Sequence, residues 1–134
     1  MKRFLSVLFL TLLSHLFLFA TQSLGKLDFL RCEYLVTPLG VDVPTPRFSW
    51  RLPAHLNKQQ AYQVIVGTDS VAVANGTGGA WDSGKILSSE VLTVYAGKAM
   101  QPYTRYYWKV SVWDDANNNY TSAVSHFETG VMGM

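Results

Sequence analysis

At 134 residues the chain has the size of one domain, and its 49% hydrophobic and 15% charged residues exclude an intrinsically disordered protein. Its single cysteine excludes a disulfide-stapled scaffold and a zinc ribbon. Of the 11 basic residues, Lys2 and Arg3 precede an apolar N-terminal run, and the other nine balance nine acidic residues, so no nucleic-acid partner is expected.

The N-terminus has the pattern of a secretory signal peptide, which we place at residues 1–23. Two basic residues precede an apolar run over residues 4–20, which is expected to be helical, and small residues follow it. Cleavage is expected before Leu24, with a cut after Ala20 as the alternative. A retained membrane anchor is the competing interpretation, although about 17 residues is at the short limit for crossing a bilayer. We therefore expect an exported protein (periplasmic, on the cell surface or secreted) that meets the membrane only through this segment.

Residues 24–134 are expected to form one all-β domain. Runs of β-branched and aromatic residues alternate with turn residues, which is typical of short strands, and no helical period of useful length occurs. The expected strands cover residues 27–35, 47–52, 60–68, 81–86, 90–96, 104–113 and 122–129. Seven such strands predict an antiparallel β-sandwich of the fibronectin type III or immunoglobulin-like class, because two sheets can bury their apolar faces against each other.

Alternation within these strands predicts which side chains face inward. The expected inward residues are Phe48, Trp50, Leu52, Tyr62, Val64, Val66, Tyr106, Trp108, Val110 and Val112. Tyr106 follows a turn at residues 100–102, and its hydroxyl is expected to bond backbone at the corner between the sheets. Cys32 is expected to be a small buried hydrophobe.

The outward face of the strand over residues 104–113 carries Tyr107 and Trp113. These two aromatic residues could cover a protein interface or stack against a sugar ring. They are the only candidate binding residues that the pattern singles out.

The chain offers few residues for chemistry. His55 and His126 have no partners at metal-ligand spacing, and the spacing of the nine carboxylates marks no pair that could face each other across a glycosidic bond. The adjacent Asp114 and Asp115 most simply begin a turn. We therefore predict no catalytic, cofactor-binding or metal-binding residue.

A calcium loop is the one metal pattern that the sequence invites. Asp115, Asn117 and Asn119 fit three ligand positions of an EF-hand loop. Tyr120 and His126, however, occupy the positions that require glycine and glutamate. Residues 114–119 are therefore predicted to form a solvated hairpin loop.

Several segments share their order and spacing with one enzyme family. They are Cys32-Glu33-Tyr34, residues 38–42 (PLGVD), 46–52 (PRFSWRL), 60–64 (QAYQV), 81–85 (WDSGK), 106–110 (YYWKV) and 127–130 (FETG). Together they resemble the N-terminal fibronectin-type-III-like module of bacterial α-L-rhamnosidases of glycoside hydrolase family 78. The similarity extends over essentially all of the chain after the signal peptide.

The resemblance implies a non-catalytic accessory module. In that family the module precedes other β domains and a helical (α/α)6 barrel, and the acidic residues that hydrolyse terminal α-L-rhamnosides belong to the barrel, no part of which matches this chain. We therefore expect an inactive fragment or isolated module whose partners are neighbouring domains of a larger glycoside hydrolase. A carbohydrate-binding module for rhamnose-containing glycans and a protein-interaction domain at the cell envelope are the alternatives.

Overall fold

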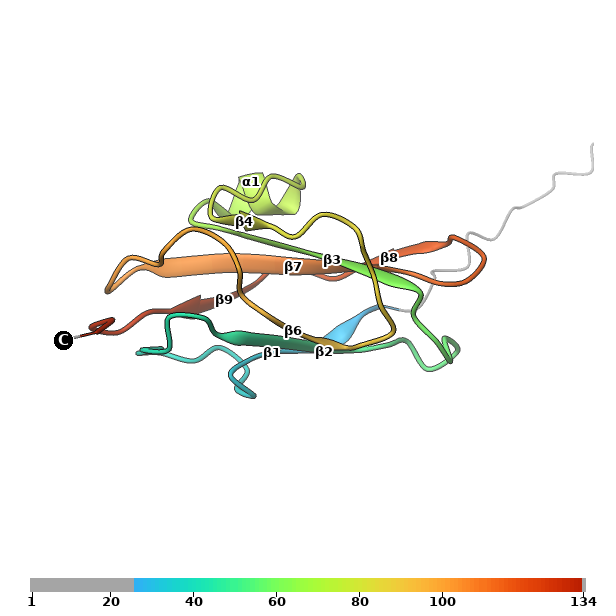
Figure 1. The fold of residues 1–134 in the computed structure, drawn as a ribbon, viewed down its shortest axis with the longest axis horizontal. Helices are drawn as coiled ribbons and strands as arrows, with labels where there is room; N and C mark the ends of the chain where they lie inside the picture. Colours follow the sequence, from blue (N-terminus) through green and yellow to red (C-terminus); the bar gives the residue numbers. More distant parts are fainter. Residues whose placement is uncertain (1–25, 134) are drawn as a thin grey trace, which may run out of the picture.

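The computed structural model describes residues 26–133, so the expected signal peptide lies outside the described residues. Within these residues nine strands form two sheets that lie face to face, and one short helix accompanies them (Figure 1). No helix within residues 26–133 has the length and apolar character needed to cross a bilayer. The elements are β1 (Asp28–Cys32), β2 (Arg47–Arg51), β3 (Ala61–Gly67), α1 (Ser70–Ala74), β4 (Trp81–Asp82), β5 (Ile86–Leu87), β6 (Leu92–Val94), β7 (Arg105–Trp113), β8 (Asn119–Thr121) and β9 (Ser125–Glu128).

The two sheets differ in size. The small sheet has the order β1-β2-β6, and the large sheet has the order β4-β3-β7-β8, with β5 also paired to β3 and β9 also paired to β7. All strand pairs are antiparallel, and β3 runs along β7 from Ala61 opposite Trp113 to Gly67 opposite Tyr107. The predicted antiparallel β-sandwich is confirmed.

The predicted count of seven strands is wrong for residues 26–133, because the expected strand over residues 81–86 is interrupted and β8 precedes the expected strand over residues 122–129. Residues 81–86 contain a turn at Gly84, whose φ of 65° suits glycine and whose N–H donates to the Asp82 carboxylate over 2.9 Å. β8 and β9 both pair with β7 but are separated by residues 122–124, where the Ser122 hydroxyl accepts the N–H of Val110 at 3.0 Å. A side chain thus replaces the carbonyl that a continuous strand would supply.

The short helix α1 was not expected from the sequence. The Asp69 side chain caps it by accepting the N–H groups of Val71 and Ala72 at 2.9 and 3.2 Å. Val73 is its buried residue, and Figure 1 shows the helix on the outer face of the large sheet. Five residues are too few to give a helical period.

The core between the sheets is aromatic, as alternation predicted. Phe48 of the small sheet packs against Trp108 and Phe127 of the large sheet, with ring centroids 4.6 and 5.7 Å apart. The other residues expected to face inward are also buried, except Leu52, which is partly buried. The Tyr106 hydroxyl accepts the N–H of Gln101 at 2.8 Å, which confirms the expected bond at the corner.

Candidate functional site

The two predicted binding residues, Tyr107 and Trp113, lie on one face but do not form one site. Both are partly buried on the outer face of β7, and their separation of six positions along the strand corresponds to about 20 Å. The Lys85 ammonium lies 4.6 Å from the centre of the Trp113 ring, and the Tyr107 ring lies 6.3 Å from that of His126. Their role in an interface or in sugar stacking stays a prediction.

The histidines and carboxylates of residues 26–133 do not gather around a metal. In that part of the chain no group of three or more His, Cys, Asp or Glu side chains is placed to hold an ion. The His55 ring instead lies 5.8 Å from the ring of Tyr120, and His126 lies beside Tyr107.

The hairpin that partly matched a calcium loop is organised by Asp114. Its carboxylate accepts the N–H groups of Ala116 and Asn118 at 3.0 and 2.8 Å, and the Tyr120 hydroxyl at 3.2 Å. The bonds from Asn118, above all that of its side chain, hold the pKa of Asp114 below its usual range. The side chains of residues 115–118 are exposed, which confirms the predicted solvated hairpin for these residues, whereas Asp114 is buried and Asn119 belongs to β8.

An arginine holds the turn that follows β1. Glu33 and Tyr34 have φ values of 50° and 64°, a left-handed conformation that favours glycine or asparagine. The Arg47 guanidinium binds the Glu33 carboxylate through Nη2 at 2.7 Å and Nε at 3.2 Å, and lies 4.7 Å from the centre of the Tyr34 ring. The hydrogen bond from Arg47 lowers the pKa of Glu33. Two segments that resemble the rhamnosidase family, residues 32–34 and 46–52, are therefore directly bonded.

Two further segments of that resemblance meet where the chain leaves the sandwich. The N–H of Val41 donates to the carbonyl of Glu128, and the carbonyl of Val41 accepts the N–H of Gly130, both at 2.9 Å. The Asp42 carboxylate accepts the N–H of Met132 at 3.1 Å, and a Cβ on Gly130 would collide with that carboxylate. Residues 38–42 thus fix the direction in which the chain runs after residue 130.

Exposed apolar side chains flank this exit. Leu39 and Tyr103 are 72% and 75% exposed, and Val43 is 42% exposed. The N–H of Tyr103 donates to the Gly130 carbonyl at 2.9 Å, which places Tyr103 beside the exit. We call Leu39, Val43 and Tyr103 the exit surface. We take these exposed apolar side chains beside the exit as candidates for a protein interface.

Alternation did not predict the exit surface. Leu39 and Val43 lie between β1 and β2, and Tyr103 precedes β7, so all three lie outside the strands. A period of two gives no information about side-chain direction in turns. The one signal in the sequence was the resemblance of residues 38–42 to the rhamnosidase family.

Comparisons with known proteins agree on one family. The model of Rha78A-like, N-terminal immunoglobulin domains matches residues 27–133. An α-L-rhamnosidase of Streptomyces avermitilis is 43% identical over 105 residues, which are 75% of this chain and 10% of that protein. An α-L-rhamnosidase of Formosa agariphila is 33% identical over 99 residues, again 10% of its length.

Solved structures give the same result. The structure of an α-L-rhamnosidase from Dictyoglumus thermophilum matches with a TM-score of 0.75 and 44% identity, over 80% of this chain and 12% of that one. The Streptomyces avermitilis enzyme, solved in complex with L-rhamnose, matches with a TM-score of 0.72 and 38% identity, over 78% of this chain and 10% of that one. The chain therefore spans about a tenth of the length of these relatives.

Proposed function

Because the chain belongs to the family of Rha78A-like N-terminal immunoglobulin domains, we propose that it is a non-catalytic accessory domain of a larger α-L-rhamnosidase. It packs against the domain that follows it through the exit surface. The observation that carries this proposal is the exit itself, where hydrogen bonds fix the chain direction beside three exposed apolar side chains. Burial of such side chains against a neighbouring domain is favourable by about 25 cal/mol for each Å² removed from water.

The carboxylates support the non-catalytic part of the proposal. Hydrolysis of a glycosidic bond uses two carboxyl groups that face each other across the substrate. Asp28, Glu33 and Glu128 each form an ion pair with an arginine instead, and Asp114 accepts the hydrogen bonds of its hairpin. These four side chains therefore hold structure in place.

Export belongs to the proposal as well. The charged and apolar pattern of residues 1–23 supports secretion with cleavage before Leu24. Mass spectrometry of the chain recovered from an expressing bacterium is expected to show a mature protein that begins at Leu24. Recovery of the uncleaved chain in the membrane fraction would instead favour a retained anchor.

A chimeric enzyme tests the docking. Residues 27–133 replace the matching segment of the Streptomyces avermitilis α-L-rhamnosidase, and both the melting temperature and the hydrolysis of an aryl α-L-rhamnoside are measured. The double variant Leu39→Ser/Tyr103→Ser is expected to lower the melting temperature of the chimera but not that of the isolated chain. Val71→Ser/Leu87→Ser is the matched control, because these side chains are 67% and 78% exposed and lie outside the exit surface.

Two results would contradict the proposal. One is equal melting temperatures for the exit-surface and control variants of the chimera. The other is hydrolysis of the aryl rhamnoside by the purified full chain alone.

A further inference from the structure

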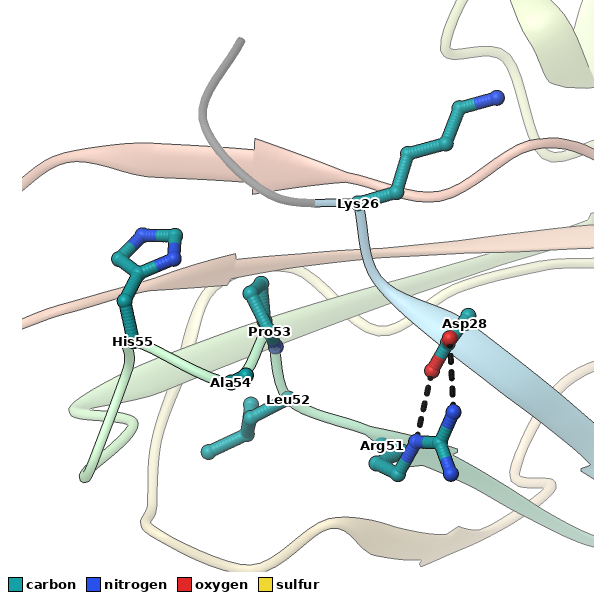
Figure 2. A pocket seen from close by; sticks show the side chains of 7 residues that line it. All are labelled: Lys26, Asp28, Arg51, Leu52, Pro53, Ala54 and His55. Carbon is teal, nitrogen blue, oxygen red and sulfur yellow. Dashed lines mark hydrogen bonds and ion pairs between the residues drawn. The ribbon is translucent and has the colours of Figure 1, made fainter. Parts of the chain in front are cut away.

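A cleft opens beside the strand ends of the small sheet, away from the exit surface. Its volume is about 500 Å³, within the range of small-ligand sites. Lys26, Asp28 and Arg51 line it together with residues 52–55, and Figure 2 shows the Asp28–Arg51 pair and His55 on opposite sides of that segment. Leu52, Pro53 and Ala54 give the segment an apolar surface, so the cleft combines an apolar wall with charged rims.

Positive charge is in excess around this cleft. Asp28 is its one acidic lining residue, and its carboxylate already binds Arg51 through two hydrogen bonds of 2.9 Å. The hydrogen bond from Arg51 lowers the pKa of Asp28, so the carboxylate and the guanidinium of this pair are both charged. Within residues 26–133, Lys26 has no carboxylate partner.

A second guanidinium lies next to the first. Arg31 and Arg51 place their Cζ atoms 3.9 and 4.6 Å from the centre of the same Phe29 ring. Over the described part of the chain, Arg31 forms no ion pair. Two arginines thus stack on one ring, which holds both side chains in place before any ligand arrives, but only Arg51 lines the cleft and binds Asp28. Arg51 already donates two hydrogen bonds to Asp28, so the guanidinium that can donate two parallel hydrogen bonds to a further carboxylate is that of Arg31.

We propose that this cleft binds the uronic-acid residues of an anionic oligosaccharide. The sugar ring lies along residues 52–54 of the cleft, and the carboxylates of the bound chain face Lys26 and the neighbouring Arg31. A sugar fits better than an acidic protein because the site is hollow and sized for a small ligand, whereas protein interfaces are broad. The inference rests on the proposed function, since a domain of a glycan-hydrolysing enzyme meets such chains.

Isothermal titration calorimetry of the full chain with trigalacturonate tests the proposal. Saturable binding is expected, together with much weaker binding of the neutral maltotriose. Lys26→Gln and Arg31→Gln should each weaken trigalacturonate binding roughly twofold to fivefold, the effect of one exposed ion pair. Lys98→Gln removes an equal charge elsewhere and should leave the affinity unchanged. Added salt should weaken binding through screening.

Four results would overturn the inference. They are no binding of trigalacturonate, equal binding of maltotriose, unchanged affinity in both Lys26→Gln and Arg31→Gln, or equal binding of triglutamate, which would show a general anion site. None of them bears on the melting temperature of the chimera, so failure here and failure of the proposed docking are separate outcomes.

Discussion

A buried glutamine joins the small sheet to the chain segment that runs toward β6. Gln59 is 1% exposed and lies just before β3. Its side-chain oxygen accepts the indole N–H of Trp50 at 2.9 Å, and its amide nitrogen donates to the carbonyls of Ser88 at 3.0 Å and Glu90 at 2.6 Å. We predict that Gln59→Leu, which keeps a side chain of similar volume, strongly destabilises the domain.

The expected loss of stability comes from the three groups that would lose their hydrogen-bond partner, namely the Trp50 indole N–H and the carbonyls of Ser88 and Glu90. An unsatisfied buried polar group costs about 1–3 kcal/mol. The indole of Trp50 is 4% exposed and cannot regain a partner from water, whereas the two carbonyls belong to more exposed residues and can regain part of theirs. The free energy of unfolding should therefore fall by about 2–4 kcal/mol, which corresponds to at least ~8 °C in melting temperature for a domain of this size.

Urea unfolding followed by tryptophan fluorescence measures this loss. Trp50→Phe provides the control, since it removes the indole donor and should make Gln59→Leu less costly by about 1 kcal/mol in a double-mutant cycle. If Gln59→Leu changed the free energy of unfolding by less than about 0.5 kcal/mol, the size of an ordinary surface effect, the reasoning would be refuted.

Three further predictions concern single side chains. Tyr106→Phe removes the acceptor of the Gln101 N–H and should lower the free energy of unfolding by about 1 kcal/mol in urea; an unchanged midpoint would contradict this. Cys32 is fully buried, and burial raises the pKa of its thiol to about 12, so it should resist iodoacetamide near pH 8 in the folded chain and react in urea; rapid labelling of folded protein would be the contrary result. The lowered pKa of Asp114 means that its stabilisation is complete above its ordinary value of about 4 and disappears as pH falls through the lower folded value. Asp114→Asn should therefore lower the melting temperature at neutral pH and have little effect in strong acid, and equal losses at both pH values would count against the hydrogen-bonding role.

The sandwich could be predicted because its longest strands alternate cleanly. In β7 the inward residues Tyr106, Trp108, Val110 and Val112 are all buried, and the outward ones between them are partly exposed. A period of two assigns each side chain to a face without knowledge of its partner. The interruptions could not be predicted in this way, because they depend on bonds between distant residues, such as the Ser122 hydroxyl with the N–H of Val110.

The candidate site was harder to predict for the same reason. Tyr107 and Trp113 do lie on the expected outward face, but the position of Lys85 over Trp113 is set by a turn 28 residues earlier in the chain. The exit surface is made by turns, where no period operates. The resemblance to a family drew attention to residues 38–42 and 127–130, yet only the structure shows that they are bonded to each other.

These bonds give the connection between β1 and β2 a role beyond linking two strands. At its start Glu33 binds Arg47 of β2, and in its middle Val41 and Asp42 bind the chain just after β9. The small sheet and the exit of the large sheet are therefore tied to the same stretch of chain. A domain that follows the exit would be oriented by backbone and carboxylate hydrogen bonds of this connection, while the aromatic core keeps the two sheets together. Substituting Asp42 should for that reason alter the orientation of a following domain at little cost to the sandwich. Substitutions in the core, to which Val41 of the connection also belongs, should instead lower the stability of the sandwich.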